Sequence, residues 1–294
     1  MTTLDAPTIG KQEELPLRGG PELHFNVPFA EYLQWKLLSQ SIIKAGREHN
    51  GGSMKALKWR WDHTFTESPT DPMLLGSALH SAFLEPDKLV DRVACFKGAA
   101  RRGKEWEQFK EDHPGKIILT SGYYEKLCGM IDGLRTNPDI IEWQKKCLGV
   151  EVSTKGQVHG LPFRGRADLL ESDVIPDLKS ISSVDDRTIE NAIWEQGYHI
   201  QGYIYTTLFD RPKFSLVFVE SSEPYDSRTI NLSDEWLRIG KLETMGIIQR
   251  IKTCLKTKRW PGISEKAEMA WPPTWVTDKF ASADLITIGG VKAF

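Results

Sequence analysis

The sequence predicts an α+β (mixed α/β) fold, because apolar residues recur at helical spacing in the first half of the chain and alternate with polar residues in the second. Helical patterns dominate residues 25–148, and strand patterns followed by further helices occupy residues 149–276. With 294 residues, of which 40% are hydrophobic and 27% charged, the chain can bury a core under a charged surface. We expect a single domain over residues 25–276, a mobile N-terminal tail over 1–24 and a C-terminal tail over 277–294.

Three helices are expected in the first half. Residues 28–44 carry apolar side chains at helical spacing, and this run ends before the turn-like Asn50-Gly51-Gly52. Residues 72–85 are apolar nearly all round, which is typical of a buried helix, and a proline follows them. Residues 121–135 follow a Thr or Ser cap and end before an Asn-Pro pair.

Strands and helices are both expected in the second half. A helical stretch over 186–209 has one interruption, at Gly197, and the last helix begins after Ser233, a residue type that caps helices. Strand-like segments lie at 151–154, 161–170, 174–181, 214–220 and 227–231. A short loop joins the second and third of these strands, so we expect them to form an antiparallel hairpin.

Composition excludes several classes of protein. The 38 Lys and Arg residues against 40 Asp and Glu leave a net charge of −2, which excludes a polybasic nucleic-acid tail and an acidic solvating protein. The four cysteines form no Cys-x-x-Cys pair, so we expect reduced thiols. The N-terminus carries charges where a signal peptide needs an apolar run, and no stretch of about 18 apolar residues occurs. We therefore expect a cytoplasmic protein with no membrane partner.

The expected hairpin brings charged side chains together, because its register pairs Asp168 with Asp177. Side chains alternate along a strand, so Arg164, Arg166 and Asp168 share one face, and Asp177 and Lys179 share the same face of the neighbouring strand. Two opposed carboxylates with Cβ atoms about 5 Å apart repel each other. A positive charge is therefore needed between them. Lys179 or Arg166 could supply it, and so could a divalent ion such as Mg²⁺.

A divalent ion here would suit metal-assisted hydrolysis of a phosphodiester, with Lys179 orienting or deprotonating the attacking water. His80 lies four residues after Gly76 on the apolar helix; a lone histidine there is more often a core residue, and only the hairpin makes it a candidate ligand. Gln201 and Tyr205 share one face of a later helix. They are either part of an amphipathic helix or hydrogen-bond donors to phosphates or bases near the metal.

Four motifs in this order resemble those of the PD-(D/E)XK nuclease superfamily, in its RecB-like branch: Gly76-Ser-Ala-Leu-His80, Gly165-Arg-Ala-Asp168, Asp177-Leu-Lys179 and Gln201-Gly-Tyr-Ile-Tyr205. More narrowly, the chain resembles the RecE-like exonucleases of phages and prophages (the C-terminal domain of exodeoxyribonuclease VIII) from about residue 25 to 275. The resemblance implies a restriction-endonuclease-like core, in which helices flank a central mixed β-sheet, preceded by a helical N-terminal part.

The resemblance also implies an activity. Such a protein would be a Mg²⁺-dependent exonuclease, with Mn²⁺ as a substitute, that degrades one strand of linear double-stranded DNA 5′-to-3′ and leaves 3′ overhangs for a strand-annealing protein in recombination. The implied metal ligands are His80, Asp168, Asp177 and the backbone carbonyl of Leu178, and the implied catalytic lysine is Lys179.

Further expectations follow from the same resemblance. Gln201 and Tyr205 would support the site or contact DNA, and Glu151 matches a frequent acidic position. Relatives form rings around DNA, so a homo-oligomer encoded by a phage or prophage and active in the bacterial cytoplasm is implied. The cysteine spacing argues against an iron–sulfur cluster. Candidate phosphate contacts are basic residues on the active face and near Trp106, where a solvated loop is the alternative: Arg164, Arg166, Arg101, Arg102 and Lys104.

Two other functions stay open at this point. A nuclease of the same fold could have another polarity, or could act on single-stranded or branched DNA, because metal ligands do not determine which end is cut. A noncatalytic DNA-binding protein could also keep the fold, although loss of a ligand or of the lysine would have been its sign.

Overall fold

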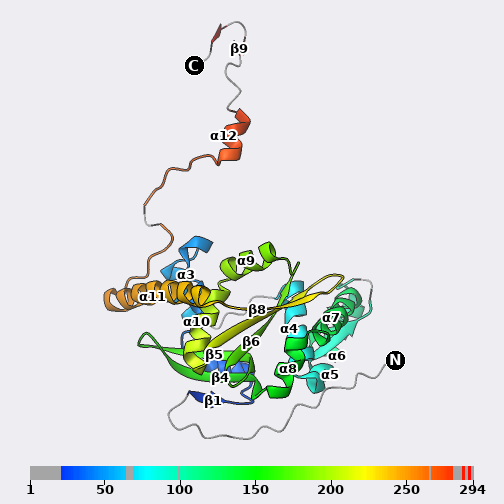
Figure 1. The fold of residues 1–294 in the computed structure, drawn as a ribbon. Helices are drawn as coiled ribbons and strands as arrows, with labels where there is room; N and C mark the ends of the chain where they lie inside the picture. Colours follow the sequence, from blue (N-terminus) through cyan, green and yellow to red (C-terminus); the bar gives the residue numbers. More distant parts are fainter. Residues whose placement is uncertain are drawn as a thin grey trace.

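Two three-stranded sheets form the centre of the protein, and helices pack around them (Figure 1). The structure is a computed structural model that describes residues 21–63, 69–98, 100–264, 266–280, 287–288 and 291–292. The first sheet is antiparallel, with the strand order β1 (Glu22–His24), β4 (Gly149–Val158) and β5 (Leu161–Leu170). The second is mixed, with the order β6 (Val174–Ile181), β7 (Lys213–Glu220) and β8 (Ser227–Asn231). This is the mixed α/β arrangement that the sequence predicts.

The fold begins earlier than the sequence predicts. Leu23 lies opposite Thr154 in the ladder between β1 and β4, and the Thr154 hydroxyl donates a hydrogen bond to the Glu22 carbonyl at 2.8 Å. Residues 22–24 therefore belong to the first sheet rather than to the expected tail. Residues 1–20, and most of the expected tail over 277–294, lie outside the described residues.

The second sheet owes its parallel pair to two helices that join β6 to β7. These are α9 (Asp186–Glu195) and α10 (Tyr198–Phe209), and the break between them falls at Gly197, as predicted. Gly197 has φ +63°, a left-handed conformation that glycine adopts without strain. Parallel strands need such a crossover connection. Within it, α10 packs across the strands and presents its buried face to them.

The predicted pairing of β5 with β6 as a hairpin is wrong. Among the described residues the ladder of β5 runs to β4 and that of β6 runs to β7, so Asp168 and Asp177 are not paired across a ladder. The two strands turn back on each other, with Glu171 N–H bonded to the Val174 carbonyl at 3.1 Å, and then diverge. The Asp168 carboxylate lies in the fork and accepts a hydrogen bond from the Leu178 backbone N–H at 2.8 Å.

The helix expected over residues 28–44 is two helices, α1 (Phe29–Gln34) and α2 (Gln40–Lys44). Between them Leu38 forms a parallel bridge with Phe163 of β5, its N–H bonding the Pro162 carbonyl and its carbonyl accepting from Arg164 N–H. Pairing with the sheet edge therefore overrides helical periodicity at this point, and it holds α1 against the first sheet.

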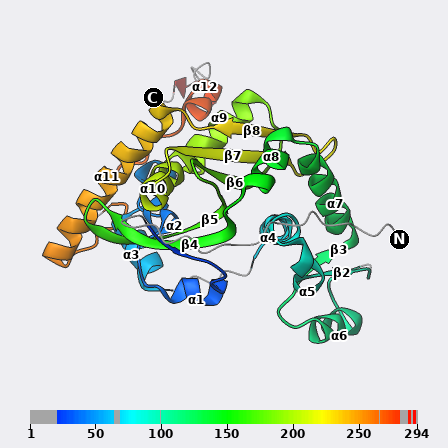
Figure 2. The same ribbon diagram turned by 60° about the horizontal axis from the view of Figure 1, so that its bottom comes forward.

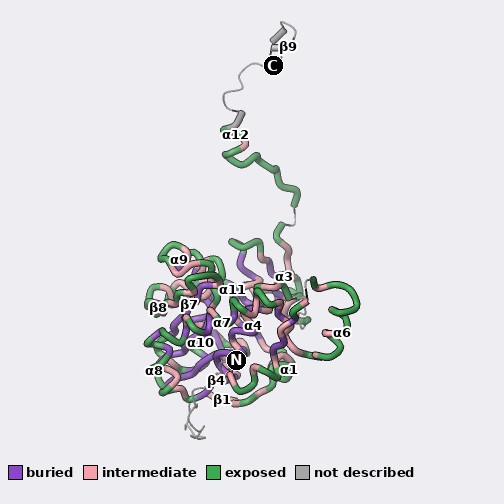
Figure 3. Tube along the Cα trace, turned by 90° about the vertical axis from the view of Figure 1, so that its right-hand side faces the viewer, coloured by how far each residue is buried: buried purple, intermediate pink, exposed green. Residues whose placement is uncertain are grey.

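Helix α4 (Asp71–Leu84) stands at the meeting point of the two sheets. Its apolar residues pack in one hydrophobic cluster with α7 (Ser121–Arg135), with Leu169 of β5 and with Leu178 of β6. A second cluster lies between the sheets and α10 with α11 (Asp234–Thr257). Figure 2 looks nearly along α4, and Figure 3 shows that the buried segments include β4, α4 and α10. Both predicted helices, 72–85 and 121–135, are confirmed.

The remaining elements surround this centre. The strands β2 (Val93–Phe96) and β3 (Ile117–Thr120) form a small parallel sheet near α4 and α6 (Lys104–Asp112). Ser233 caps α11 by accepting a hydrogen bond from Trp236 N–H. No described helix is long and apolar enough to cross a membrane, and the four cysteines are free. The other helices and strands are η1 (Glu48–Asn50), α3 (Met54–Asp62), η2 (Pro86–Lys88), α5 (Leu89–Arg92), α8 (Pro138–Lys146), α12 (Thr274–Phe280), β9 (Thr287–Ile288) and β10 (Val291–Lys292).

Candidate active site

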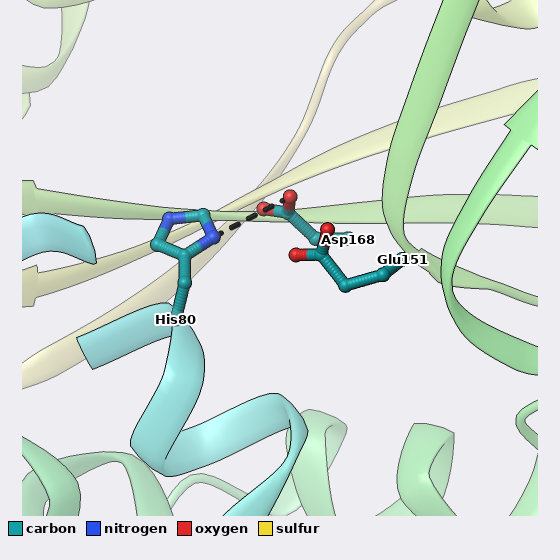
Figure 4. A group of neighbouring side chains, drawn as sticks. All are labelled: His80, Glu151 and Asp168. Carbon is teal, nitrogen blue, oxygen red and sulfur yellow. Dashed lines mark ion pairs between the residues drawn. The ribbon is translucent and has the colours of Figure 1, made fainter. Parts of the chain in front are cut away.

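Three side chains from three elements converge at the fork between the sheets. His80 of α4, Glu151 of β4 and Asp168 of β5 each place one ligand atom within 4.8 Å of the others, and Figure 4 shows them pointing toward one another. His80 Nδ1 lies 3.5 Å from Asp168 Oδ1. His80 Nε2 donates to the Leu178 carbonyl at 3.1 Å, which leaves Nδ1 as the ring nitrogen that can bind a metal.

The sequence predicts two opposed carboxylates, Asp168 and Asp177, but in the structure the carboxylate opposite Asp168 is that of Glu151. Val150 pairs with Leu169 and Val152 with Ala167, so Glu151 and Asp168 are neighbours across the β4–β5 ladder. Glu151 has φ +52°, a left-handed conformation that is costly for a residue with a side chain. Such strain persists where the surrounding structure imposes it, and it occurs often at functional sites.

Asp177 lies beside this group in a separate buried arrangement. Its carboxylate pairs with Lys179 and accepts a hydrogen bond from Gln201 Nε2 at 2.7 Å. Asp177 is only 2% exposed and is not among the three converging residues. Its part as a metal ligand therefore stays a prediction. The ring of Tyr198 lies 5.3 Å from Lys179 Nζ, so the lysine is held between a carboxylate and an aromatic face.

Basic and aromatic side chains lie next to the three converging residues, beside β5. Arg166 pairs with Glu151 and donates to the Val27 carbonyl at 2.8 Å. The buried Tyr205 hydroxyl accepts from the Arg166 backbone N–H at 3.4 Å. Gln201 and Tyr205, predicted to share a helix face, thus both touch the site, one through Asp177 and the other through β5.

Burial and mutual charge shift the ionisation of the acidic group. Burial, reinforced by the Asp168 charge, raises the pKa of Glu151. Burial also raises the pKa of Asp177, and Lys179 offsets this only in part. For Asp168 burial acts in the same direction, but His80, Lys179 and the Leu178 N–H together hold its pKa below the ordinary value. The protein's own cations therefore compensate the negative charge of these buried carboxylates only in part, and a bound cation would stabilise their ionised forms.

The same pairs raise the pKa of the two basic groups. Burial opposes protonation of His80, but the Asp168 carboxylate outweighs it and raises the pKa of the imidazole. Burial opposes the charge of Lys179 as well, and Asp177 together with Asp168 raises its pKa. Without a bound ion, the acids beside both groups therefore favour their protonated forms.

The donor set fits a hard divalent ion. Two carboxylates and one imidazole converge from three rigid elements, and His80 is oriented by the Leu178 carbonyl behind it. His80, Glu151 and Asp168 would hold the ion, and Asp177 borders the same place. The Leu178 carbonyl, predicted as a ligand, accepts a hydrogen bond from His80 in this structure.

A cleft of about 1160 Å³ opens over this group. Its lining includes His80, Glu151, Asp168, Lys179 and Tyr205, together with Arg164 and Arg166. The acids and the lysine therefore open onto the same cleft, with two guanidinium groups nearby.

The other basic candidates lie elsewhere. Arg101 pairs with Asp71, and its guanidinium lies 5.8 Å from the Trp106 ring, so it is part of the structure around α6. Neither Arg101 nor Arg102 lines the cleft. The solvated-loop alternative describes Arg102 better, since it is exposed.

Sequence reasoning missed two aromatic residues of α1 that line the cleft. In the sequence Phe29 and Tyr32 are only apolar positions of the helix expected over 28–44, yet both form part of the lining. Periodicity marks which side chains leave the solvent and does not reveal which of them border a cleft. Nothing in the sequence separates Phe29 from an ordinary core residue.

Fold and site together define a protein of the PD-(D/E)XK nuclease class. The chain belongs to the family described as PDDEXK-like domain of unknown function (DUF3799), whose profile matches residues 39–271. The motifs at His80, Asp168, Asp177 and Lys179 all lie within the matched region.

Comparison with solved structures shows the same fold. The crystal structure of a candidate exonuclease from Eubacterium rectale superimposes with a TM-score of 0.59 over 88% of this chain and 100% of its own, at 16% identity. The structure of SSO0001 aligns over 60% of this chain and 84% of its own, at 19% identity and a TM-score of 0.29, which is too low to bear on the fold. No curated protein matches the chain.

Proposed function

We propose that this protein is a Mg²⁺-dependent exonuclease that hydrolyses linear double-stranded DNA from its ends. The observation that supports this most is the convergence of His80, Glu151 and Asp168 beside Lys179 at the base of an open cleft. Acidic ligands suit a hard ion, and a lysine near them suits the activation of water. The matched family and the structural relative agree with a nuclease.

The roles of the residues follow from their surroundings. A bound divalent ion would supply Lewis acidity toward the phosphate and lower the pKa of a water. His80, Glu151 and Asp168 would hold that ion, and Asp177 would keep Lys179 facing the cleft through their ion pair. Lys179 would orient the attacking water or offset charge on the phosphate. Gln201 would fix Asp177 through its 2.7 Å hydrogen bond.

The finer parts of the proposal rest on resemblance to RecE-like exonucleases. These are 5′-to-3′ polarity, 3′ single-stranded products passed to an annealing protein, a homo-oligomeric ring and a phage or prophage setting in the bacterial cytoplasm. Mn²⁺ would substitute for Mg²⁺ because both accept carboxylate and water ligands.

Purified protein and matched DNA substrates test the proposal. With Mg²⁺ it should degrade a linear duplex and spare the same DNA as a covalently closed circle, and EDTA should stop it. Labels at the 5′ and 3′ ends of single- and double-stranded substrates give the polarity and separate the proposal from a nuclease that acts on single strands or branches. Size measurement by light scattering tests the ring.

Variants locate the reaction within the cleft. Lys179→Met should lose at least about 100-fold in rate, the usual size of a general acid–base contribution. Asp168→Asn should lose both turnover and the heat of Mg²⁺ or Mn²⁺ binding in calorimetry. Lys213→Met is the matched control, since Lys213 pairs with exposed Asp173 at the far end of β6 and β7. Full activity in the Lys179 or Asp168 variant would refute the site.

Absence of all turnover would leave the noncatalytic alternative. In that case wild-type protein would bind DNA but show neither cleavage nor a binding heat with Mg²⁺ or Mn²⁺. The complete set of His80, Glu151, Asp168 and Lys179 argues against that alternative, because a protein that only binds DNA does not need them.

A further inference from the structure

Helix α1 presents an aromatic ring to the cleft. Phe29 stacks on Tyr32 with ring centroids 6.0 Å apart and 22° between the planes. Tyr32 is 7% exposed, whereas Phe29 is 59% exposed, so Phe29 keeps much of its ring open to solvent while a buried ring supports it. Both residues line the same cleft as the candidate metal ligands. An open phenyl ring at this place in the cleft has no role in phosphodiester hydrolysis.

A guanidinium without an acidic partner lies beside the Tyr32 ring on which Phe29 stacks. Arg164 of β5 donates to the Tyr32 carbonyl at 2.5 Å and lies 4.7 Å from the Tyr32 ring. Within the part of the chain that the structure describes, Arg164 pairs with no carboxylate, whereas Arg166 next to it pairs with Glu151. Its Nε is buried and has no hydrogen-bond partner there. Arg164 is therefore a cation in the cleft whose charge the protein does not neutralise.

The rest of the fold holds this surface in place. The Leu38–Phe163 bridge fixes the chain after α1 to β5, and Arg166 fixes the chain before α1 by donating to the Val27 carbonyl at 2.8 Å. A prearranged surface loses little entropy when a ligand binds. We call Phe29, Tyr32 and Arg164 the α1 wall.

We propose that the α1 wall is a nucleobase-stacking subsite, in which one base of the substrate strand packs on the open ring of Phe29 while Arg164 pairs with a phosphate of that strand. The inference rests on the proposed function and deepens it. Stacking on an aromatic side chain tolerates any base, because every base has a π-face, and it needs a base that has left its pair. The subsite would therefore favour locally unpaired nucleotides next to the reacting phosphate.

Binding without cleavage gives the direct test. In EDTA, the affinity for a fluorescein-labelled single-stranded oligonucleotide is measured by anisotropy for wild type, Phe29→Ala, Phe29→Leu and Phe29→Trp. Loss of one stacked base costs about 1–3 kcal/mol, so Phe29→Ala should raise Kd roughly 5- to 150-fold. Phe29→Leu should also bind weakly although it keeps apolar volume, and Phe29→Trp should bind at least as tightly as wild type. Trp59→Ala, which removes another exposed aromatic residue from outside the cleft lining, should leave Kd unchanged.

An abasic scan identifies the contact itself. An abasic nucleotide moved along the oligonucleotide should weaken binding to wild type at one position, and that penalty should vanish in Phe29→Ala. Arg164→Gln should reduce the slope of log K against log salt by about 0.7, the value for one phosphate contact on a single strand.

The outcomes separate the inference from the function on which it rests. Equal abasic penalties in wild type and Phe29→Ala at every position, with normal cleavage by both, would overturn the stacking subsite alone. A wild-type protein that neither binds nor cleaves DNA would overturn the proposed function together with it. Matching melting temperatures for wild type and Phe29→Leu would show that weak binding by that variant does not come from unfolding.

Discussion

Helix α11 crosses α10 at Gly240, and a methyl group there would displace the helix that carries Gln201. A Cβ on Gly240 would lie 2.1 Å from the His199 carbonyl oxygen and 2.6 Å from its carbon. These are backbone atoms, so no side chain can rotate out of the way, and α10 would have to withdraw by about 1 Å. Because Gln201 donates to Asp177 at 2.7 Å, a shift of that size would break this hydrogen bond.

Two opposing terms determine the size of the effect of Gly240→Ala. Alanine in a helix is favoured over glycine by about 0.8–1.0 kcal/mol. Overpacking costs about 1–3 kcal/mol, and a clash with backbone belongs at the upper end. We therefore expect the free energy of unfolding to fall by about 2 kcal/mol. A methyl group on Gly246, in the same helix, would meet no described atom within 4 Å, so Gly246→Ala should gain about 1 kcal/mol.

Thermal and urea unfolding of the two variants check this reasoning. A difference of about 3 kcal/mol corresponds to a separation in Tm of roughly 6–12 °C for a domain of this size. Nuclease activity should fall in Gly240→Ala and stay at the wild-type level in Gly246→Ala. If Gly240→Ala melted at or above the wild-type temperature, the close packing of α10 on α11 would not be what fixes Gln201.

Three further variants test buried charges. Gln201→Glu puts a second carboxylate beside Asp177, and keeping one of them protonated costs at most about 5 kcal/mol at pH 8 but about 1 kcal/mol at pH 5. Urea unfolding in EDTA should therefore show a loss of stability that grows as pH rises, and a loss independent of pH would contradict the contact. Burial lowers the pKa of Lys44 to about 7, so its charge disfavours folding most at low pH and less as pH rises toward 10.5. Lys44→Met should accordingly raise Tm more at pH 6 than at pH 9, and the reverse order would refute burial as the cause. Arg47 is 1% exposed and is bonded to Glu243 at 2.7 Å, so Arg47→Met should lower the free energy of unfolding by about 3 kcal/mol. Adding Glu243→Gln in a double-mutant cycle should lower it little further.

The helices and strands could be predicted because their signals are local. The strands 161–170 and 174–181 and the helix 121–135 match the structure to the residue, since alternation and caps are properties of each segment alone. Which strands pair is not a local property. Both β5 and β6 carry the alternation that a hairpin needs, yet each finds a better partner elsewhere, so the predicted pairing of Asp168 with Asp177 was wrong.

The kind of candidate site could be predicted from the sequence, but not which two carboxylates face each other. Opposed carboxylates were expected and are found, but the opposed pair is Glu151 with Asp168 rather than Asp168 with Asp177. Its position depends on a left-handed backbone in the middle of β4, a conformation that non-glycine residues seldom adopt and that sequence does not indicate. His80 could be named only by its motif, because its helix gives no other sign of a ligand.

The fork between β5 and β6 explains why the site lies where it does. Where two strands part, backbone donors lose their ladder partners, and a buried N–H without an acceptor costs about 1–3 kcal/mol. Asp168 Oδ2 accepts from Leu178 N–H, and His80 donates to the Leu178 carbonyl, so side chains replace the missing ladder on both sides of one residue. The same two side chains are candidate ligands, so the hydrogen bonds to Leu178 already orient them without a bound metal. Asp168→Asn, which can keep the hydrogen bond and lose the charge, should therefore fold with near wild-type stability in EDTA while losing the extra stability that Mg²⁺ gives the wild type.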